Sequence, residues 1–142
     1  MENYSFERLK NNYDSIVNSI KEFTKDRNIQ REIKIVAVSK THPTEAILNA
    51  MECGIEHFGE NYVQELKAKF EEIQQIGKEQ PKWHFIGHLQ TNKVKYIVPF
   101  VSLIHSVDSV HLAEEIDKQS RKVGRVTDVL IQVNTSGERS KF

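Results

Sequence analysis

The sequence predicts an α/β fold built on a parallel β-sheet, and three observations support this prediction. After residue 32, short apolar runs alternate with amphipathic stretches, which is typical of repeated βα units. The apolar runs "IVAV" and "VLI" are continuous, as expected of strands that are buried on both faces. No low-complexity tract, repeat or Pro/Gly-rich linker divides the 142 residues, so we expect one domain over residues 1–142.

The first element expected is a covering helix within residues 1–27. From residue 5 to residue 23, apolar side chains recur at intervals of three and four, and polar side chains occupy the opposite side. The polar stretch "TKDRNIQRE" follows it, and we expect the βα units over residues 33–142.

Five strands are expected in these units, at residues 33–38, 55–59, 83–87, 102–107 and 128–134. The helix after the first strand begins with Pro43 and Thr44, at helix-start positions, and stops at Gly54. Two later helices carry apolar stripes and end at Gly77 and Gly124, and a shorter helical segment lies around "TNKVKYIV".

The spacing of the strands leaves two architectures open. Strand starts are about 24 residues apart, so an eight-stranded barrel with its first helix would need roughly 225 residues. Five parallel strands also make a complete open doubly wound sheet. The spacing alone does not choose between this sheet and a truncated barrel.

Composition excludes several classes of function. Twenty basic and twenty acidic residues cancel, so no long-range field attracts nucleic acid or an anionic membrane. Cys53 is the sole cysteine, which excludes an internal disulfide or a multi-cysteine zinc site and favours a buried structural thiol. The chain shows no apolar leader segment and no run of about 20 apolar residues, so a cytoplasmic protein is expected.

Polar residues gather at the predicted carboxyl ends of the strands, which is where ligands bind in both architectures. They are Ser39, Lys40, Gly59, Glu60, Asn61, Gly87, His88, Ser106, Asp108, Asn134, Thr135 and Ser136.

Lys40 is the candidate with the most distinctive chemistry. Strand alternation places it on the face of Val36 and Val38, so in a barrel it emerges at the mouth. Apolar walls there would partly desolvate the amine and favour its neutral form, which can attack a carbonyl and form a Schiff base. From the residues alone, a solvated strand end is the better-supported interpretation.

Other candidates have simple structural interpretations. His84 and His88 are four residues apart, but they lie in a strand-like stretch and no third ligand accompanies them, so no metal site is expected. Asn61 begins a helical segment, so N-capping is the simpler role and a ligand hydrogen bond the alternative. Trp83 is expected to pack between strand and helix.

Five ordered motifs then carry a family resemblance. The segments "AVSKTHP", "HFGENYVQE", "WHFIGHLQTNK", "HSVDS" and "VLIQVNTSGERSK" resemble the pyridoxal phosphate homeostasis protein family, also called the proline synthetase co-transcribed family. The resemblance covers residues 33–141. It implies a protein that binds pyridoxal 5′-phosphate (PLP) and takes part in intracellular PLP homeostasis. It also implies a (β/α)₈ barrel of the alanine racemase N-terminal-domain type, here truncated after about five of the eight strands.

The resemblance also assigns roles to three residues. Lys40 matches the lysine that holds PLP as a Schiff base, and no turnover is expected. Asn61 matches a residue close to the cofactor ring, and His84 lies on a strand that lines the same cavity.

The chain departs from the family in its length. Family members run further, and that further segment carries the phosphate-binding loops and an arginine near the pyridine nitrogen. A dianion without those donors loses most of its non-covalent binding, so the resemblance implies weak or absent PLP binding by this chain. An unclosed barrel also predicts self-association through its open edges.

Two alternatives remain. The first is a PLP-dependent amino-acid racemase or a related enzyme, which needs an acid/base on each face of the substrate. No tyrosine stands out at a strand end as a partner for Lys40, which favours a carrier. The second is a non-catalytic α/β protein-interaction module, against which the polar strand ends argue.

Overall fold

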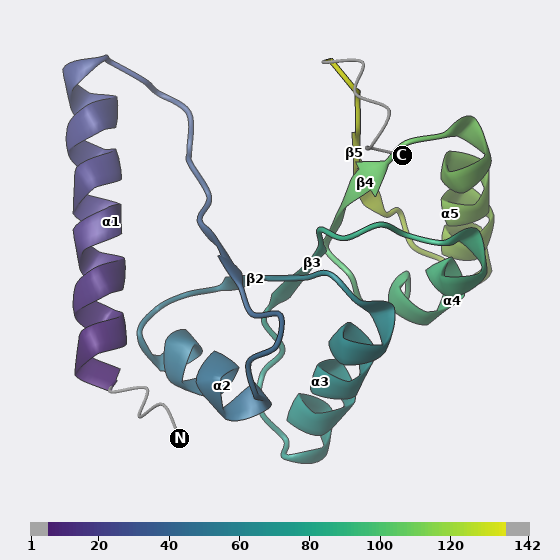
Figure 1. Ribbon diagram of the computed structural model, residues 1–142, viewed down its shortest axis with the longest axis horizontal. Coiled ribbons are helices and arrows are strands. Elements are labelled where there is room, and N and C mark those ends of the chain that lie inside the picture. The colour runs from purple at the N-terminus through teal and green to yellow at the C-terminus, as the bar shows by residue number, and fades with distance from the viewer. Residues whose placement is uncertain (1–5, 136–142) are drawn as a thin grey trace.

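Five parallel strands form one sheet in the computed structural model, which describes residues 6–135 (Figure 1). Their order in space is their order in the chain: β1 (Val36–Val38), β2 (His57–Glu60), β3 (Lys82–Phe85), β4 (Leu103–Val107) and β5 (Asp128–Ile131). A doubly wound sheet reverses its strand order at a switch point, and this sheet does not. The sequential order is that of a barrel, so the predicted fold class is confirmed.

The connecting helices follow the outer side of the curved sheet in Figure 1. They are α2 (Thr44–Glu52), α3 (Val63–Gln75), the 3₁₀ turn η1 (Thr91–Lys93) with the short α4 (Val94–Ile97), and α5 (Val110–Lys122). The predicted stops are confirmed at Gly77 and Gly124, where φ is +68° and +65°. These are left-handed conformations that glycine adopts without steric cost.

The core lies between the sheet and these helices. Phe58, Trp83 and Phe85 leave the outer face of neighbouring strands and are at most 1% exposed. They pack with buried residues of the helices, namely Leu66, Ile73, Val94, Ile97, Leu112 and Ile116. The packing role predicted for Trp83 is confirmed, and its indole Nε1 donates to Gln80 Oε1 at 3.0 Å.

The two edge strands differ most from prediction. The first strand was expected over 33–38 and covers Val36–Val38, and the fifth was expected over 128–134 and ends at Ile131. Both were also expected to be buried on both faces, yet Val38 is 50% exposed and Ile131 is 68% exposed. Each edge strand pairs with a single neighbour, so half of its backbone groups have no sheet partner to extend the ladder.

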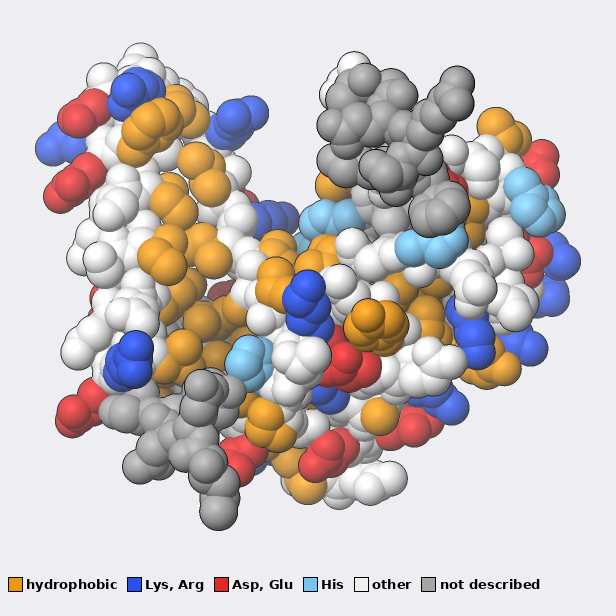
Figure 2. Space-filling model, viewed as in Figure 1, with side chains coloured by type: hydrophobic (Ala, Val, Ile, Leu, Met, Phe, Trp, Pro, Cys, Tyr) orange, Lys and Arg blue, Asp and Glu red, His pale blue; other side chains and the backbone are white. Residues whose placement is uncertain are grey.

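The expected covering helix is present as α1 (Phe6–Asp26), but only part of its apolar stripe is covered. Leu9 and Tyr13 pack against the core, and the Tyr13 hydroxyl donates to the Gly54 carbonyl at 3.4 Å. Ile16 and Phe23 are about half exposed. Figure 2 shows hydrophobic side chains along α1 beside a deep notch between this helix and the rest of the molecule.

Two other expectations concern single features of the chain. Cys53 is a buried free thiol at the end of α2, as predicted, and burial raises its pKa. Within residues 6–135, no helix has the length and apolar character needed to cross a membrane.

The burial of α3 gives a direct test of the core. Ile73 is 0% exposed, whereas Ile76, one turn later, is 52% exposed. Ile73→Ala is expected to lower the free energy of unfolding by about 2–5 kcal/mol because it leaves a cavity between helix and sheet. Ile76→Ala is expected to change it by less than about 1 kcal/mol. Urea unfolding of both variants measures the difference, and equal effects would show that α3 does not pack as described.

Candidate functional site

Lys40 lies in the turn directly after β1, at the carboxyl edge of the sheet as predicted. Its side chain is exposed, which agrees with the solvated strand end that the residues alone favoured and not with the desolvation considered for a barrel mouth. The reason is that β1 is an edge strand whose inner face is open, as the half-exposed Val38 beside it shows.

The backbone on both sides of Lys40 is held firmly, although the side chain is not. Ser39 is buried, its N–H donates to the Gly59 carbonyl at 3.0 Å, and its hydroxyl donates to Glu60 Oε1 at 2.7 Å. Thr41 has a φ of +66°, and its N–H donates to Glu65 Oε1 at 2.6 Å. A β-branched residue rarely adopts this left-handed conformation, so an external contact is needed to maintain it.

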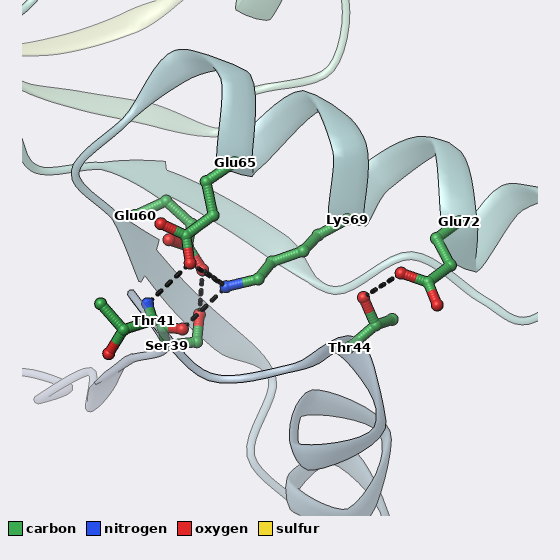
Figure 3. A network of polar contacts seen from close by, with 7 residues as sticks. All are labelled: Ser39, Thr41, Thr44, Glu60, Glu65, Lys69 and Glu72. Carbon is green, nitrogen blue, oxygen red and sulfur yellow. Dashed lines mark hydrogen bonds and ion pairs between the residues drawn. The ribbon is translucent and has the colours of Figure 1, made fainter.

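Lys69 joins these contacts into one network (Figure 3). Its Nζ donates to the Ser39 carbonyl at 2.8 Å, to Glu60 Oε1 at 2.7 Å and to Glu65 Oε1 at 2.7 Å. We call Glu60, Glu65 and Lys69 the lysine–carboxylate cluster. The side chains of Lys69 and Glu60 are 7% and 0% exposed, and a buried charge is tolerated only when it is paired and hydrogen-bonded.

The cluster is positioned by two elements. Glu65 and Lys69 are four residues apart on α3, so they share one face of the helix. Glu60 is the last residue of β2. Burial raises the pKa of Glu65, but the hydrogen bonds from Lys69 and Thr41 outweigh it and bring this pKa below its usual value. Thr44 Oγ1 also donates to Glu72 Oε2 at 2.5 Å and ties α2 to α3.

Asn61 lies in the bend after β2 and does not cap a helix. The N-cap of α3 is Tyr62, and no side chain makes a capping hydrogen bond there, so the expected capping role is wrong. Asn61 instead lines a pocket together with Gly87, His88 and other residues of the β3–η1 connection. A Cβ at Gly87 would collide with the Asn61 carbonyl, so this glycine permits the close approach of the two strand ends.

His84 is the centre of a row of three histidines on neighbouring strands. Its Nε2 lies 2.8 Å from His57 Nδ1, and its Nδ1 lies 2.8 Å from His105 Nε2. Burial, and then the like charges of His105 and His57, lower the pKa of His84 to about 4. The sequence analysis did not single out His57 or His105, although each occupies a strand position on the same face as its neighbour in the row.

The strand register relates the three predicted residues. Val38 pairs with Gly59, and Gly59 pairs with His84. Lys40 and Asn61 each follow their paired residue by two positions, so both lie at the carboxyl edge, one layer above His84. The structure therefore brings Lys40 and Asn61 to one level of the sheet and places His84 beneath them.

Tyr62 bears on the alternative enzyme, for which no tyrosine stood out in the sequence as a partner for Lys40. It follows Asn61 after the end of β2, at the N-cap of α3, and is 62% exposed.

Two further residues predicted at this edge, His88 and Asp108, lie near each other. His88 Nδ1 lies 3.7 Å from Asp108 Oδ2. The described part of the chain contains no group of three or more His, Cys, Asp or Glu side chains arranged to hold a metal ion. Ser136 lies outside the described residues.

Comparison with known proteins identifies the family. The family model described as "Alanine racemase, N-terminal domain" matches residues 6–140. The chain belongs to this family. Solved structures agree: an unknown protein from Bifidobacterium adolescentis superposes with a TM-score of 0.83 at 30% identity, covering 99% of this chain and 60% of that one.

Curated relatives confirm the narrower resemblance. A pyridoxal phosphate homeostasis protein from Aquifex aeolicus is 49% identical over 108 residues, or 76% of this chain and 46% of the relative. The protein of that name from Escherichia coli is 41% identical over 110 residues, or 78% of this chain and 47% of the relative. The chain thus spans about half the length of these relatives. PipY of Synechococcus elongatus, solved with PLP bound, has a TM-score of 0.69 at 37% identity, covering 83% of this chain and 55% of PipY.

The histidine row predicts a loss of stability in mild acid. The unfolded chain takes up a proton at His84 below pH 6.5, whereas the folded protein does so only near pH 4. The stability that a neutral His84 provides is therefore complete above pH 6.5 and decreases as the pH falls to about 4, by on the order of 3 kcal/mol in total. Urea unfolding between pH 7.5 and pH 4 measures this decrease.

Matched variants assign the effect to the row. His84→Gln is expected to make the dependence on pH shallower, because one of the groups with a lowered pKa is gone. His111→Gln, which removes an exposed histidine from α5, is expected to leave it unchanged. A pH dependence that His84→Gln does not alter would contradict the assignment.

Proposed function

We propose that this chain binds PLP for intracellular PLP homeostasis, with the cofactor held as a Schiff base on Lys40 and without turnover of a substrate. One observation carries the proposal: a solvent-accessible primary amine stands on a backbone that a buried network holds on both sides. An amine in such a position can reach a carbonyl in solution while its attachment point stays in place.

The residues at this edge fit one end of the cofactor. When bound, PLP supplies an aldehyde that a lysine amine attacks, and water leaves as the imine forms. Val36 and Val38 lead up to Lys40 on its face of β1 and offer apolar contact to an aromatic ring. Asn61, at the same level of the sheet, brings an amide that can donate or accept a hydrogen bond. The names of the curated relatives and the PLP-bound PipY structure support the same function.

A racemase or related enzyme is the second candidate, and Tyr62 is the observation that favours it. A phenol at the carboxyl end of β2, beside Asn61, is a candidate for the second acid/base that racemisation needs. Conversion of an L-amino acid to its D form by the PLP-loaded protein, lost in Tyr62→Phe, would place the enzyme ahead of the carrier.

The Schiff base gives the sharpest test of the proposal. After incubation with PLP and reduction with borohydride, mass spectrometry is expected to find the pyridoxyl group on Lys40, and Lys40→Ala is expected to abolish it. Lys34→Ala is the matched control, because it removes an exposed lysine six residues earlier on the same segment. Labelling that is spread over surface lysines and unaffected by Lys40→Ala would contradict the proposal.

We also propose that the chain self-associates through its open sheet edge. Leu130, Ile131 and Val133 are 49–70% exposed on and beyond β5, which pairs with β4 alone among the strands of residues 6–135. Analytical ultracentrifugation is expected to show an average molecular mass that rises with protein concentration. Ile131→Lys is expected to reduce this rise, and Val126→Lys, at a 90% exposed position before β5, is expected to leave it unchanged. A monomer at every concentration would contradict the proposal.

A further inference from the structure

The Lys40 side chain is exposed, so the backbone around it, from Ser39 to Thr41, determines where the side chain starts and which way it leaves the turn. Strand β1 ends at Val38, and the chain turns at Lys40 and Thr41. Thr41 has a positive φ, a conformation that a threonine leaves unless something holds it. The contacts of Ser39 and Thr41 therefore fix the point from which the Lys40 side chain extends.

Those contacts converge on one side chain. The Ser39 carbonyl accepts from Lys69 Nζ, and the Ser39 hydroxyl donates to Glu60 Oε1, which also accepts from Lys69. On the other side of Lys40, the Thr41 N–H donates to Glu65 Oε1, a third acceptor for Lys69. The three protons of one ammonium group are thus directed at the two sides of a single turn.

Removing the ammonium would release both sides. Glu60 Oε1 and Glu65 Oε1 each lie 2.7 Å from Lys69 Nζ, so two carboxylates approach the same point. Without the cation between them they repel, and a buried carboxylate loses its compensating charge. Glu65 is the more exposed of the two, at 24% of its side chain, so it is the one free to turn toward solvent and release Thr41.

We propose that Lys69 is a positioning residue for Lys40: the lysine–carboxylate cluster clamps Ser39 and Thr41 and so holds the Lys40 amine where it reacts with an aldehyde. This inference rests on the proposed function for its chemistry. The clamp itself is independent of PLP, because every contact in it lies within the chain.

The test compares Lys69→Met with Lys67→Met, which removes an exposed lysine from the same helix, paired with Glu71. Lys69→Met is expected to slow formation of the Schiff base with PLP, followed by visible absorbance, by at least about tenfold, since small misplacements of a reacting group have effects of this size. Lys69→Arg, which keeps the charge, is expected to recover part of the rate. Lys67→Met is expected to react like the parent.

A second measurement needs no cofactor. Hydrogen exchange followed by NMR is expected to show faster exchange of the Thr41 amide in Lys69→Met, while amides of β3 stay protected. Both proteins are compared under conditions in which both are folded. If Lys69→Met exchanges the Thr41 amide faster but forms the Schiff base at the rate of the parent, the positioning role is overturned and Lys69 is a purely structural residue. If the parent itself forms no adduct with PLP, the proposed function fails, whereas the exchange data still test the clamp.

Glu65→Ala keeps the test decisive if Lys69→Met does not fold. Glu65 is only partly buried, so the protein is expected to tolerate its substitution more easily. The substitution nevertheless removes the carboxylate that accepts the hydrogen bond from the Thr41 N–H. This variant is expected to slow Schiff-base formation and speed Thr41 exchange, and Glu65→Gln, which keeps an acceptor oxygen, is expected to have a smaller effect. A parent-like rate in Glu65→Ala would overturn the proposal.

Discussion

A single buried ammonium group organises the carboxyl edge of this sheet. Lys69 Nζ makes three short contacts, and through them it joins helix α3, the end of β2 and the turn after β1. Burying charges costs several kcal/mol for each ion unless partners compensate it, so this arrangement is stable only as a whole. The positive φ of Thr41 and the placement of Lys40 both depend on it.

Much of this architecture could be predicted from local patterns, because apolar periodicity and glycine positions act over short distances. They located the helices and strands of the described residues, and strand alternation placed Lys40 on the face of Val36 and Val38 at the carboxyl edge of the sheet. The cluster was missed because its contacts join residues up to 30 positions apart. One signal was present in the sequence: Lys69 falls within the apolar stripe of Leu66, Phe70 and Ile73, where a charged residue has to find a buried partner.

The surroundings of Lys40 were less clearly determined, because the residues favoured a solvated strand end but left desolvation at a barrel mouth as the alternative. Desolvation depends on which elements surround a side chain, and sequence periodicity does not specify the neighbours of an edge strand. The same limit explains the exposure of β1 and β5. Their sequences have the continuous apolar pattern of buried strands, but each strand pairs with one neighbour only in the described sheet. Register is better determined, because a shift by one residue would turn Phe58 and Phe85 away from the helices.

The histidine row shows how differently the two faces of the sheet are built. On β3, Trp83 and Phe85 point to the helices, while His84 points to the inner face between His57 and His105. Each contact from Nδ1 to Nε2 needs one donor and one acceptor nitrogen, and the lowered pKa values of all three histidines favour neutral rings. In three neutral rings the proton then lies on the nitrogen of the same name, either Nδ1 in every ring or Nε2 in every ring. The row is then a directional chain of hydrogen bonds, and it gives the inner face beneath Lys40 a polar lining.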